Sequence, residues 1–273
     1  MGIKADTAGT YEETCKYLEA AAANFSLDAQ SPTLKTDLGN IYLLLASSAT
    51  RANKQDDVLK YLKRAESAKT PVMETYLWLY DIYKEVEDTL NCGKVIKTAE
   101  ANANRADSAG FTHLEGYRLD YYAMIKDSTN FLATADALIA AFPKEPGILS
   151  MVAGHLLNNN YYDKAETILR QGLELSPNHF DLNRQLGLRY FFEADDNLKL
   201  ESQVITKGNY ADAKRYKDKA IQLLETAYPF VEKAYSINGN DRQNNIMLNQ
   251  IMTTIGKPIP AELKEKIDLY YKK

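Results

Sequence analysis

Three histidines and two cysteines are the side chains in this sequence that could bind a metal ion or support nucleophilic chemistry. His113, His155 and His179 lie far apart, and none belongs to an HExxH motif or to another pair of ligands four residues apart. Cys15 and Cys92 form no CxxC motif and have no histidine beside them. A catalytic nucleophile needs a base and an orienting group held next to it, and no spacing here suggests such a set. We therefore predict no catalytic residue, no metal site and no cofactor.

The sequence also lacks the acidic and glycine-containing motifs of calcium sites, hydrolases and nucleotide-binding sites. Asp195 and Asp196 are adjacent carboxylates without the glycine-containing loop of a calcium site, which favours ordinary surface charge. The sequence contains no GxSxG motif, no P-loop and no GxGxxG motif. The chain is therefore expected to be non-enzymatic.

The composition indicates a folded chain without a nucleic-acid-binding surface. Hydrophobic residues make up 45% of the 273 residues and charged residues 26%, while the net charge is only −4. Proteins that bind nucleic acid normally have an excess of lysine and arginine on one face. No segment approaches the 18 or more consecutive apolar residues of a membrane helix. We expect neither nucleic-acid binding nor membrane insertion of this chain.

The elements that must position any site are helices. Apolar residues recur at three- and four-residue spacings, which is the period of amphipathic α-helices, and the prolines and glycines fall between these stretches. The predicted helices pair along the chain and cover residues 11–25, 32 to about 45, 55–68, 72–86, 89–103, 108–126, 129–142, 146–177 as two helices joined at Asn158–Asn160, 180–206, 210–237, 242–255 and 261–271.

The clearest pair occupies residues 146–177. Its second helix contains a small residue, a large apolar residue, a second small residue and a terminal proline: Ala165, Leu169, Gly172 and Pro177. This series resembles the signature of the tetratricopeptide repeat. The resemblance implies an all-α fold, a right-handed α–α superhelix built as a solenoid of antiparallel helix pairs.

The resemblance covers most of residues 30–257 and implies that the whole chain, residues 1–273, is a single solenoid. Residues 10–28 would form an N-terminal half-repeat or capping helix, and residues 258–273 a C-terminal capping helix with one polar face. The sequence of residues 228–241, YPFVEKAYSINGND, is similar to sequences of bacterial tetratricopeptide proteins of the Bacteroides type, many of which are exported.

One unit is longer than the rest. First helices begin near residues 180 and 242, which are 62 residues apart, whereas the family period is 34 residues. The surplus of 28 residues would add about four turns to each helix at 3.6 residues per turn. We predict an elongated repeat at residues 180–241 with a projecting hairpin that turns at Lys207–Asn209. Pro229 should bend its second arm, because proline cannot bond to the carbonyl four residues earlier.

The two arms of this hairpin differ in charge. The outgoing arm has acidic residues and the returning arm has basic ones: Glu193, Asp195, Asp196 and Glu201, then Lys214, Arg215, Lys217 and Lys219. Two interpretations remain open. Either the solvated arms screen one another, each exposed pair being worth under about 1 kcal/mol, or the arms offer a charged surface to a partner.

The resemblance also implies a binding surface, because the first helices of tetratricopeptide units line a concave groove that takes a peptide or a partner helix. The groove positions are Asn40, Trp78, Asp81, Lys84, Asp120, Arg184, Leu188 and Phe191. The aromatic members could equally pack between repeats. Arg184 is the foremost of them, since a guanidinium can bind a carboxylate through two hydrogen bonds.

We therefore predict a protein–protein interaction scaffold that binds a peptide or protein partner through the groove, through the hairpin at residues 191–226, or through both. The alternative is an accessory protein of the bacterial cell envelope for carbohydrate binding or uptake, because exposed tyrosines can stack on sugars. The candidate tyrosines are Tyr121, Tyr122, Tyr161 and Tyr162. An envelope or periplasmic location would follow if a signal peptide once preceded Met1-Gly2, and a cytoplasmic location otherwise.

Overall fold

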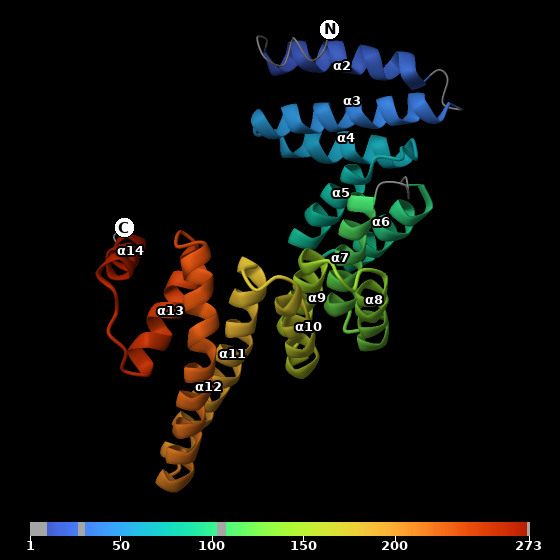
Figure 1. Ribbon diagram of the computed structural model, residues 1–273. Coiled ribbons are helices and arrows are strands. Elements are labelled where there is room, and N and C mark those ends of the chain that lie inside the picture. Colours follow the sequence, from blue (N-terminus) through green and yellow to red (C-terminus); the bar gives the residue numbers. More distant parts are fainter. Residues whose placement is uncertain (1–9, 27–30, 103–107, 272–273) are drawn as a thin grey trace. The chain divides into compact units, whose positions relative to one another are not determined.

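The computed structural model describes residues 10–26, 31–102 and 108–271, and these residues form α-helices joined by short connections (Figure 1). Contacts within the chain define two compact units, residues 1–135 and 136–273. Successive helices pack as antiparallel pairs within each unit, which confirms the predicted all-α tetratricopeptide-like solenoid. Among the described helices, none combines the length and the apolar character needed to cross a lipid bilayer.

Some expectations fall on residues that the structure does not describe. The origin of Met1-Gly2, residues 27–28 of the predicted N-terminal helix and residues 272–273 of the predicted C-terminal helix lie outside the described residues. The capping roles of both terminal helices, and the single solenoid over residues 1–273, stay predictions.

The first unit is built around buried leucine and tyrosine side chains. Its helices are α2 (Tyr11–Ser26), α3 (Pro32–Arg51), α4 (Gln55–Ser67), α5 (Met73–Glu85), α6 (Thr89–Asn102) and α7 (Ser108–Met124), followed by α8 (Ser128–Ala141), which crosses the boundary between the units in sequence. Leu45 and Leu79 are wholly inaccessible to solvent. The hydroxyl of Tyr11 donates to Asp57 at 2.7 Å and so ties α2 to α4.

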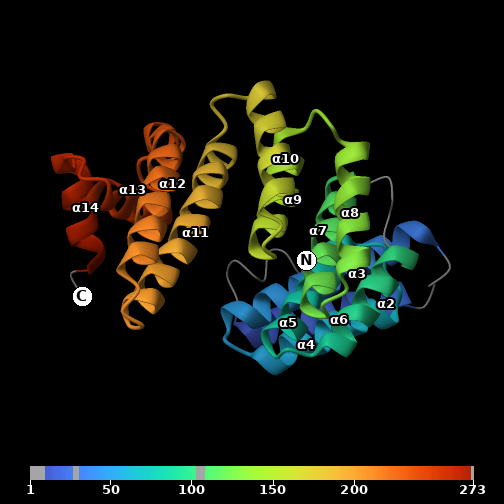
Figure 2. The ribbon, with the colours of Figure 1, turned by 90° about the horizontal axis from the view of Figure 1, so that it is seen from below.

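The second unit contains the predicted signature and the long repeat. Its helices are α9 (Pro146–Asn158), α10 (Tyr162–Leu175), α11 (Phe180–Ile205), α12 (Tyr210–Ile237), α13 (Arg242–Thr254) and α14 (Ala261–Tyr271). Figure 2 shows α11 to α14 following one another across this unit. The four signature residues pack as the motif requires, since Ala165, Leu169 and Gly172 are buried and α10 ends just before Pro177.

Polar side chains begin three of these helices. Asn209 accepts a hydrogen bond from the amide of Asp212 at 3.2 Å, and Asp241 accepts one from the amide of Asn244 at 2.7 Å. The Nδ1 atom of His179 accepts from the amide of Leu182 at 3.4 Å. Each contact satisfies one of the amides that a helix N-terminus leaves without an internal partner. His179 is therefore a helix cap.

The long repeat is an elongated helical hairpin, as predicted. Helix α11 has 26 residues and α12 has 28, whereas α9 and α13 have 13 each. Figure 1 shows α11 and α12 lying side by side and extending beyond α13. Gly208 in the turn has a φ of +76°, a conformation that glycine adopts without steric cost. Helix α12 continues through Pro229 without interruption, and the bend expected there stays a prediction.

Small residues bring the two long helices close together. Buried alanines line the seam on both arms: Ala194, Ala213, Ala220 and Ala227. Gly187 marks a close approach of the two helices, because a Cβ atom added to it would overlap Cγ2 of Val231. A larger side chain at position 187 would thus push α11 away from α12.

We expect Gly187→Ala to lower the free energy of unfolding by about 1–3 kcal/mol, since overpacking forces helices apart. Gly147→Ala is the matched control: Gly147 also lies in a helix, but a Cβ atom there would have no neighbour within 4 Å. Urea unfolding followed by circular dichroism measures both. Equal stability of the two variants would contradict the close approach.

Candidate functional site

Side chains of α11 and α13 enclose a hollow of about 340 Å³ on the second unit. Its lining is mostly apolar and also includes three amide side chains and one arginine. The lining residues are Arg184, Leu188, Phe191 and Phe192 from α11, and Gln243, Asn244, Ile246, Met247 and Gln250 from α13. The hollow therefore brings together three of the predicted groove residues, Arg184, Leu188 and Phe191.

The hollow continues along α11. A second space of about 240 Å³ shares Phe191 and Gln250 with the first and reaches Asp195 and Thr254. Arg184, Leu188, Phe191 and Asp195 follow one another at spacings of four, three and four residues, which places them on one face of the helix. We call these two adjoining hollows the α11–α13 groove.

Arg184 has unused hydrogen-bonding capacity. Its side chain is 22% exposed, and its Nη2 atom lies 3.4 Å from Oδ1 of the more exposed Asp181. Its Nε atom is buried and meets no hydrogen-bond acceptor among the described residues. Buried donors normally find a partner, so the guanidinium keeps a hydrogen-bonding group that its contact with Asp181 does not use.

Asn244 anchors the other wall. It is inaccessible to solvent, and its Nδ2 atom donates to the carbonyl of Val231 at 3.2 Å. This bond ties the start of α13 to α12. The positions of Ile246 and Met247 in the lining thus depend on contacts with the long hairpin.

The other five predicted groove residues belong to the first unit, where three of them pair with neighbours. Lys84 forms an ion pair with Asp120, and the hydroxyl of Tyr117 donates to Asp81 at 2.8 Å. Burial, together with the hydrogen bond to Asp81, raises the pKa of Tyr117, which keeps its hydroxyl protonated as a donor. These pairs join α5 to α7.

Asn40 and Trp78, the remaining two predicted groove residues, differ in solvent exposure. Asn40 is exposed on α3. Trp78 is half-buried and packs against the core of the first unit, as the packing interpretation of the aromatic positions expects.

The contribution of α13 to the groove was not predicted from the sequence. Gln243, Met247, Gln250 and Thr254 repeat the spacing of four, three and four residues found on α11, so the signal was present in the sequence. This pattern on α13 contains no charged residue and no motif, so it could not be distinguished from the face of a helix that packs in the core.

A further hollow of about 560 Å³ lies between the α9–α10 turn and α11. It is lined by Leu157, Asn158, Asn160, Tyr162, Phe192, Asp195, Asp196 and Lys199. The rings of Tyr162 and Phe192 have centroids 6.5 Å apart at an angle of 41°. Of the four tyrosines considered for sugar stacking, this hollow contains Tyr162. Tyr121 instead lies against Gly93 of α6, and Tyr122 packs beside Tyr121 at 5.6 Å.

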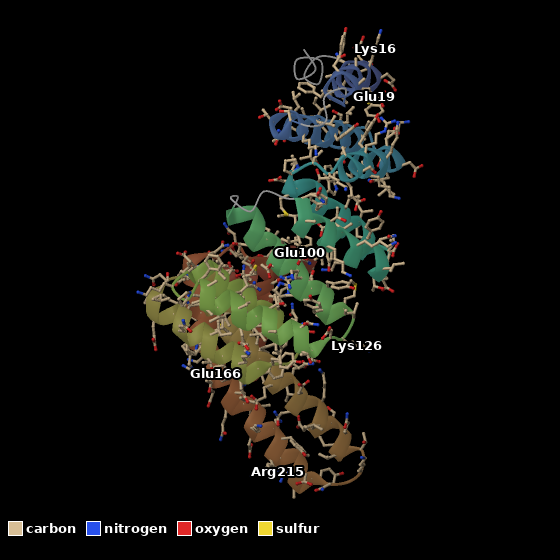
Figure 3. All side chains as sticks on the ribbon, turned by 90° about the vertical axis from the view of Figure 1, so that its right-hand side faces the viewer. Lys16, Glu19, Glu100, Lys126, Glu166 and Arg215 are labelled. Atoms are coloured by element: carbon tan, nitrogen blue, oxygen red, sulfur yellow. The ribbon has the colours of Figure 1, made fainter. Side chains whose placement is uncertain are left out.

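An ion cluster around Arg189 holds α11 in place. Arg189 is 8% exposed, and its Nε atom lies 2.9 Å from Oε2 of Glu166 on α10. It also pairs with Glu193, which in turn pairs with Lys219 of α12 at 3.0 Å. The cluster therefore connects α10, α11 and α12. Figure 3 labels Glu166 on α10, and Arg215 close to the turn of the hairpin.

The same cluster sets the protonation of its carboxylates. Partial burial alone would raise the pKa of Glu193, but hydrogen bonds from Arg189 and Lys219 outweigh it and hold that pKa below its usual range. The pKa of Glu166 is lowered in the same way against burial, by Tyr190, Arg170 and Arg189. Both groups are consequently ionised at neutral pH.

The helix pairs, the small-residue contacts and the groove on first helices define the fold of a tetratricopeptide-repeat protein. Yeast Tom70 shares this fold with a TM-score of 0.54 and 12% identity, over 98% of this chain and 55% of the Tom70 chain. The chain thus spans about half the length of Tom70.

Two further solved structures are similar at lower scores. The C-terminal part of a TPR repeat-containing protein from Cytophaga hutchinsonii has a TM-score of 0.46 and 16% identity, over 97% of this chain and 98% of that one. YrrB, described as a TPR protein with an unusual peptide-binding site, has a TM-score of 0.43 and 13% identity, over 82% and 99%. No protein-family model matches the sequence, and no curated protein matches it.

The Arg189 cluster predicts a pH-dependent effect on stability. Lowered carboxylate pKa values stabilise the fold above the usual glutamate pKa of about 4.3, and this contribution is lost as the pH falls through the lowered values. Arg189→Met removes the central cation and leaves partly buried carboxylates without it. The free energy of unfolding should therefore fall by about 2–3 kcal/mol at pH 7. The difference in the free energy of unfolding between the variant and wild type should become smaller near pH 3.5, because the variant's carboxylates are protonated there.

Urea unfolding at the two pH values measures this difference. Arg215→Met is the control, because Arg215 pairs with Asp212 at 3.3 Å on the exposed surface of the same hairpin, and such pairs are worth under about 1 kcal/mol. A loss in Arg189→Met that is the same at both pH values would show that packing, rather than charge, explains the effect.

Proposed function

We propose that this protein is a non-enzymatic scaffold that binds a peptide or protein partner, and that the α11–α13 groove is its binding site. The observation that supports the proposal is an apolar hollow bordered by an arginine with an unpaired buried donor. Arginine and aromatic side chains dominate the energetics of protein interfaces when they are desolvated. Leu188, Phe191 and Ile246 offer that apolar surface, and Arg184 offers the polar anchor.

The fold supports the same proposal. Helical solenoids of this type present their first helices as an extended binding surface, and α11 and α13 are both first helices of their pairs. Arg184, Leu188 and Phe191 of the second unit remain partly exposed, whereas Asp81, Lys84 and Asp120 of the first unit bond to neighbouring helices. We therefore place the partner on the second unit.

The long hairpin is a second surface for the same partner. Its returning arm exposes a hollow lined by Ala211, Lys214, Arg215, Asp218, Lys219 and Gln222. Lys219 pairs with Glu193 across the hairpin, while Lys199 pairs with Asp195 and Asp196 within its own arm. Screening between the arms therefore involves Lys219, and Lys214 remains exposed for a partner.

Phe191→Ala tests the groove. Peptides selected from a displayed random library on the wild-type protein should bind this variant at least about tenfold more weakly, because truncating an interface aromatic costs more than about 1.4 kcal/mol. Leu175→Ala is the matched control, since Leu175 is an exposed apolar residue at the end of α10, outside the groove. Calorimetric titration gives the affinities. Selected peptides that bind both variants as tightly as wild type would place the site elsewhere.

Carbohydrate binding in the cell envelope is the second candidate, and the hollow beside Tyr162 favours it. Two aromatic rings there lie next to the amides of Asn158 and Asn160 and the carboxylates of Asp195 and Asp196. An aromatic ring offers an apolar platform, and amides and carboxylates bind hydroxyl groups.

A glycan array probed with wild type and with Tyr162→Ala tests this candidate. We expect signals that disappear in Tyr162→Ala and persist in Tyr210→Ala, whose tyrosine is 72% exposed near the hairpin turn. An array on which the wild-type protein gives no signal rejects the candidate.

A further inference from the structure

The α11–α13 groove has opposite charges at its two ends. Arg184 and Asp195 lie on the same face of α11, eleven residues apart, which at 1.5 Å per residue is about 16 Å. An extended peptide covers this distance with about five residues, at roughly 3.3 Å each. A ligand of that length can therefore contact both charges at once.

The Arg184 end carries a guanidinium that is incompletely paired. Asp181 is its partner in an ion pair, at 3.4 Å, and the Asp181 side chain is 48% exposed. Such a pair is weak, and the buried Nε atom stays without an acceptor among the described residues. A carboxylate arriving from the groove would meet a guanidinium that is already positioned.

The Asp195 end is negative. Asp195 and Asp196 share a single cation, Lys199, at 2.6 and 3.2 Å, which leaves one net negative charge. Across the groove, Gln250 and Thr254 of α13 carry no charge. A lysine or arginine side chain is the ligand group that this end favours.

Between the ends the lining is uncharged. Leu188, Phe191, Ile246 and Met247 provide apolar surface, and the side chains of Gln243 and Gln250 are exposed beside them. Amide side chains donate and accept hydrogen bonds and can pair with a peptide backbone. An extended segment presents its backbone groups to such amides, whereas a helix bonds them internally.

We propose that the groove binds an extended protein segment with a carboxylate at one end, a lysine or arginine about five residues away, and apolar side chains between them. The proposal rests on the proposed function and names the chemistry of its partner. The opposite charges fix the orientation of the segment, with its acidic end at Arg184 and its basic end at Asp195.

A synthetic peptide array tests the charge pattern. Its four sets carry apolar residues between acid–base, base–acid, acid–acid or base–base ends, at spacings of five and eleven residues. The wild-type protein should bind one opposite-charge set at the five-residue spacing about tenfold better than either like-charge set. Arg184→Glu should shift the preference to base–base peptides, and Asp195→Lys to acid–acid peptides.

Glu201→Lys on α11 and Lys233→Glu on α12 are matched charge reversals outside the groove, and both should keep the wild-type preference. If binding needs Phe191 but the preferred charges do not change in Arg184→Glu and Asp195→Lys, this inference is wrong and the proposed function stands. If no bound peptide depends on Phe191, both are wrong. A preference for the eleven-residue spacing would indicate a helical ligand and overturn the extended segment.

Discussion

The guanidinium of Arg189 is the group around which the second unit is arranged. It is almost wholly buried, and a buried cation is tolerated only when carboxylates surround it. Glu166 of α10 and Glu193 of α11 supply them, and Glu193 also accepts Lys219 of α12. One cluster therefore sets the contact of α11 with the helices on both sides of it, including the second arm of the hairpin.

This cluster occupies one face of α11 and does not involve the opposite face, which lines the groove. Residues five apart on a helix of 3.6 residues per turn lie on different sides, so Arg189 points away from the face that contains Arg184 and Leu188. The charged face anchors the helix, and the other face lines the groove with α13. A residue that holds the fold and a residue available to a partner are thus only five positions apart.

The elongated hairpin is stabilised mainly by its own two helices beyond the reach of α13. Alanines at the seam permit close approach, and Gly187 lies against Val231 near the base. Because whole turns were added to both arms, the buried face continues in register along them. The extension consequently adds exposed surface without requiring a new core.

The sequence by itself determined the helices, because their signals are local. Proline, glycine and capping residues stand at their ends, so the predicted turn at Lys207–Asn209 and the final helix at 261–271 match the structure closely. The resemblance to the tetratricopeptide repeat, seen in the sequence alone, also implied that Arg184, Leu188 and Phe191 line a groove, and their spacings of four and three residues put them on one helix face. These inferences need only neighbours along the chain.

Tertiary structure alone decided which of the predicted residues stay available to a partner. Lys84 and Asp120 lie 36 positions apart and pair with one another, which removes them from an open groove. Met247 enters the site because α12 brings α13 beside α11. Such pairings depend on how separate helices pack, and the periodicity of a single helix contains no information about the helix it will meet.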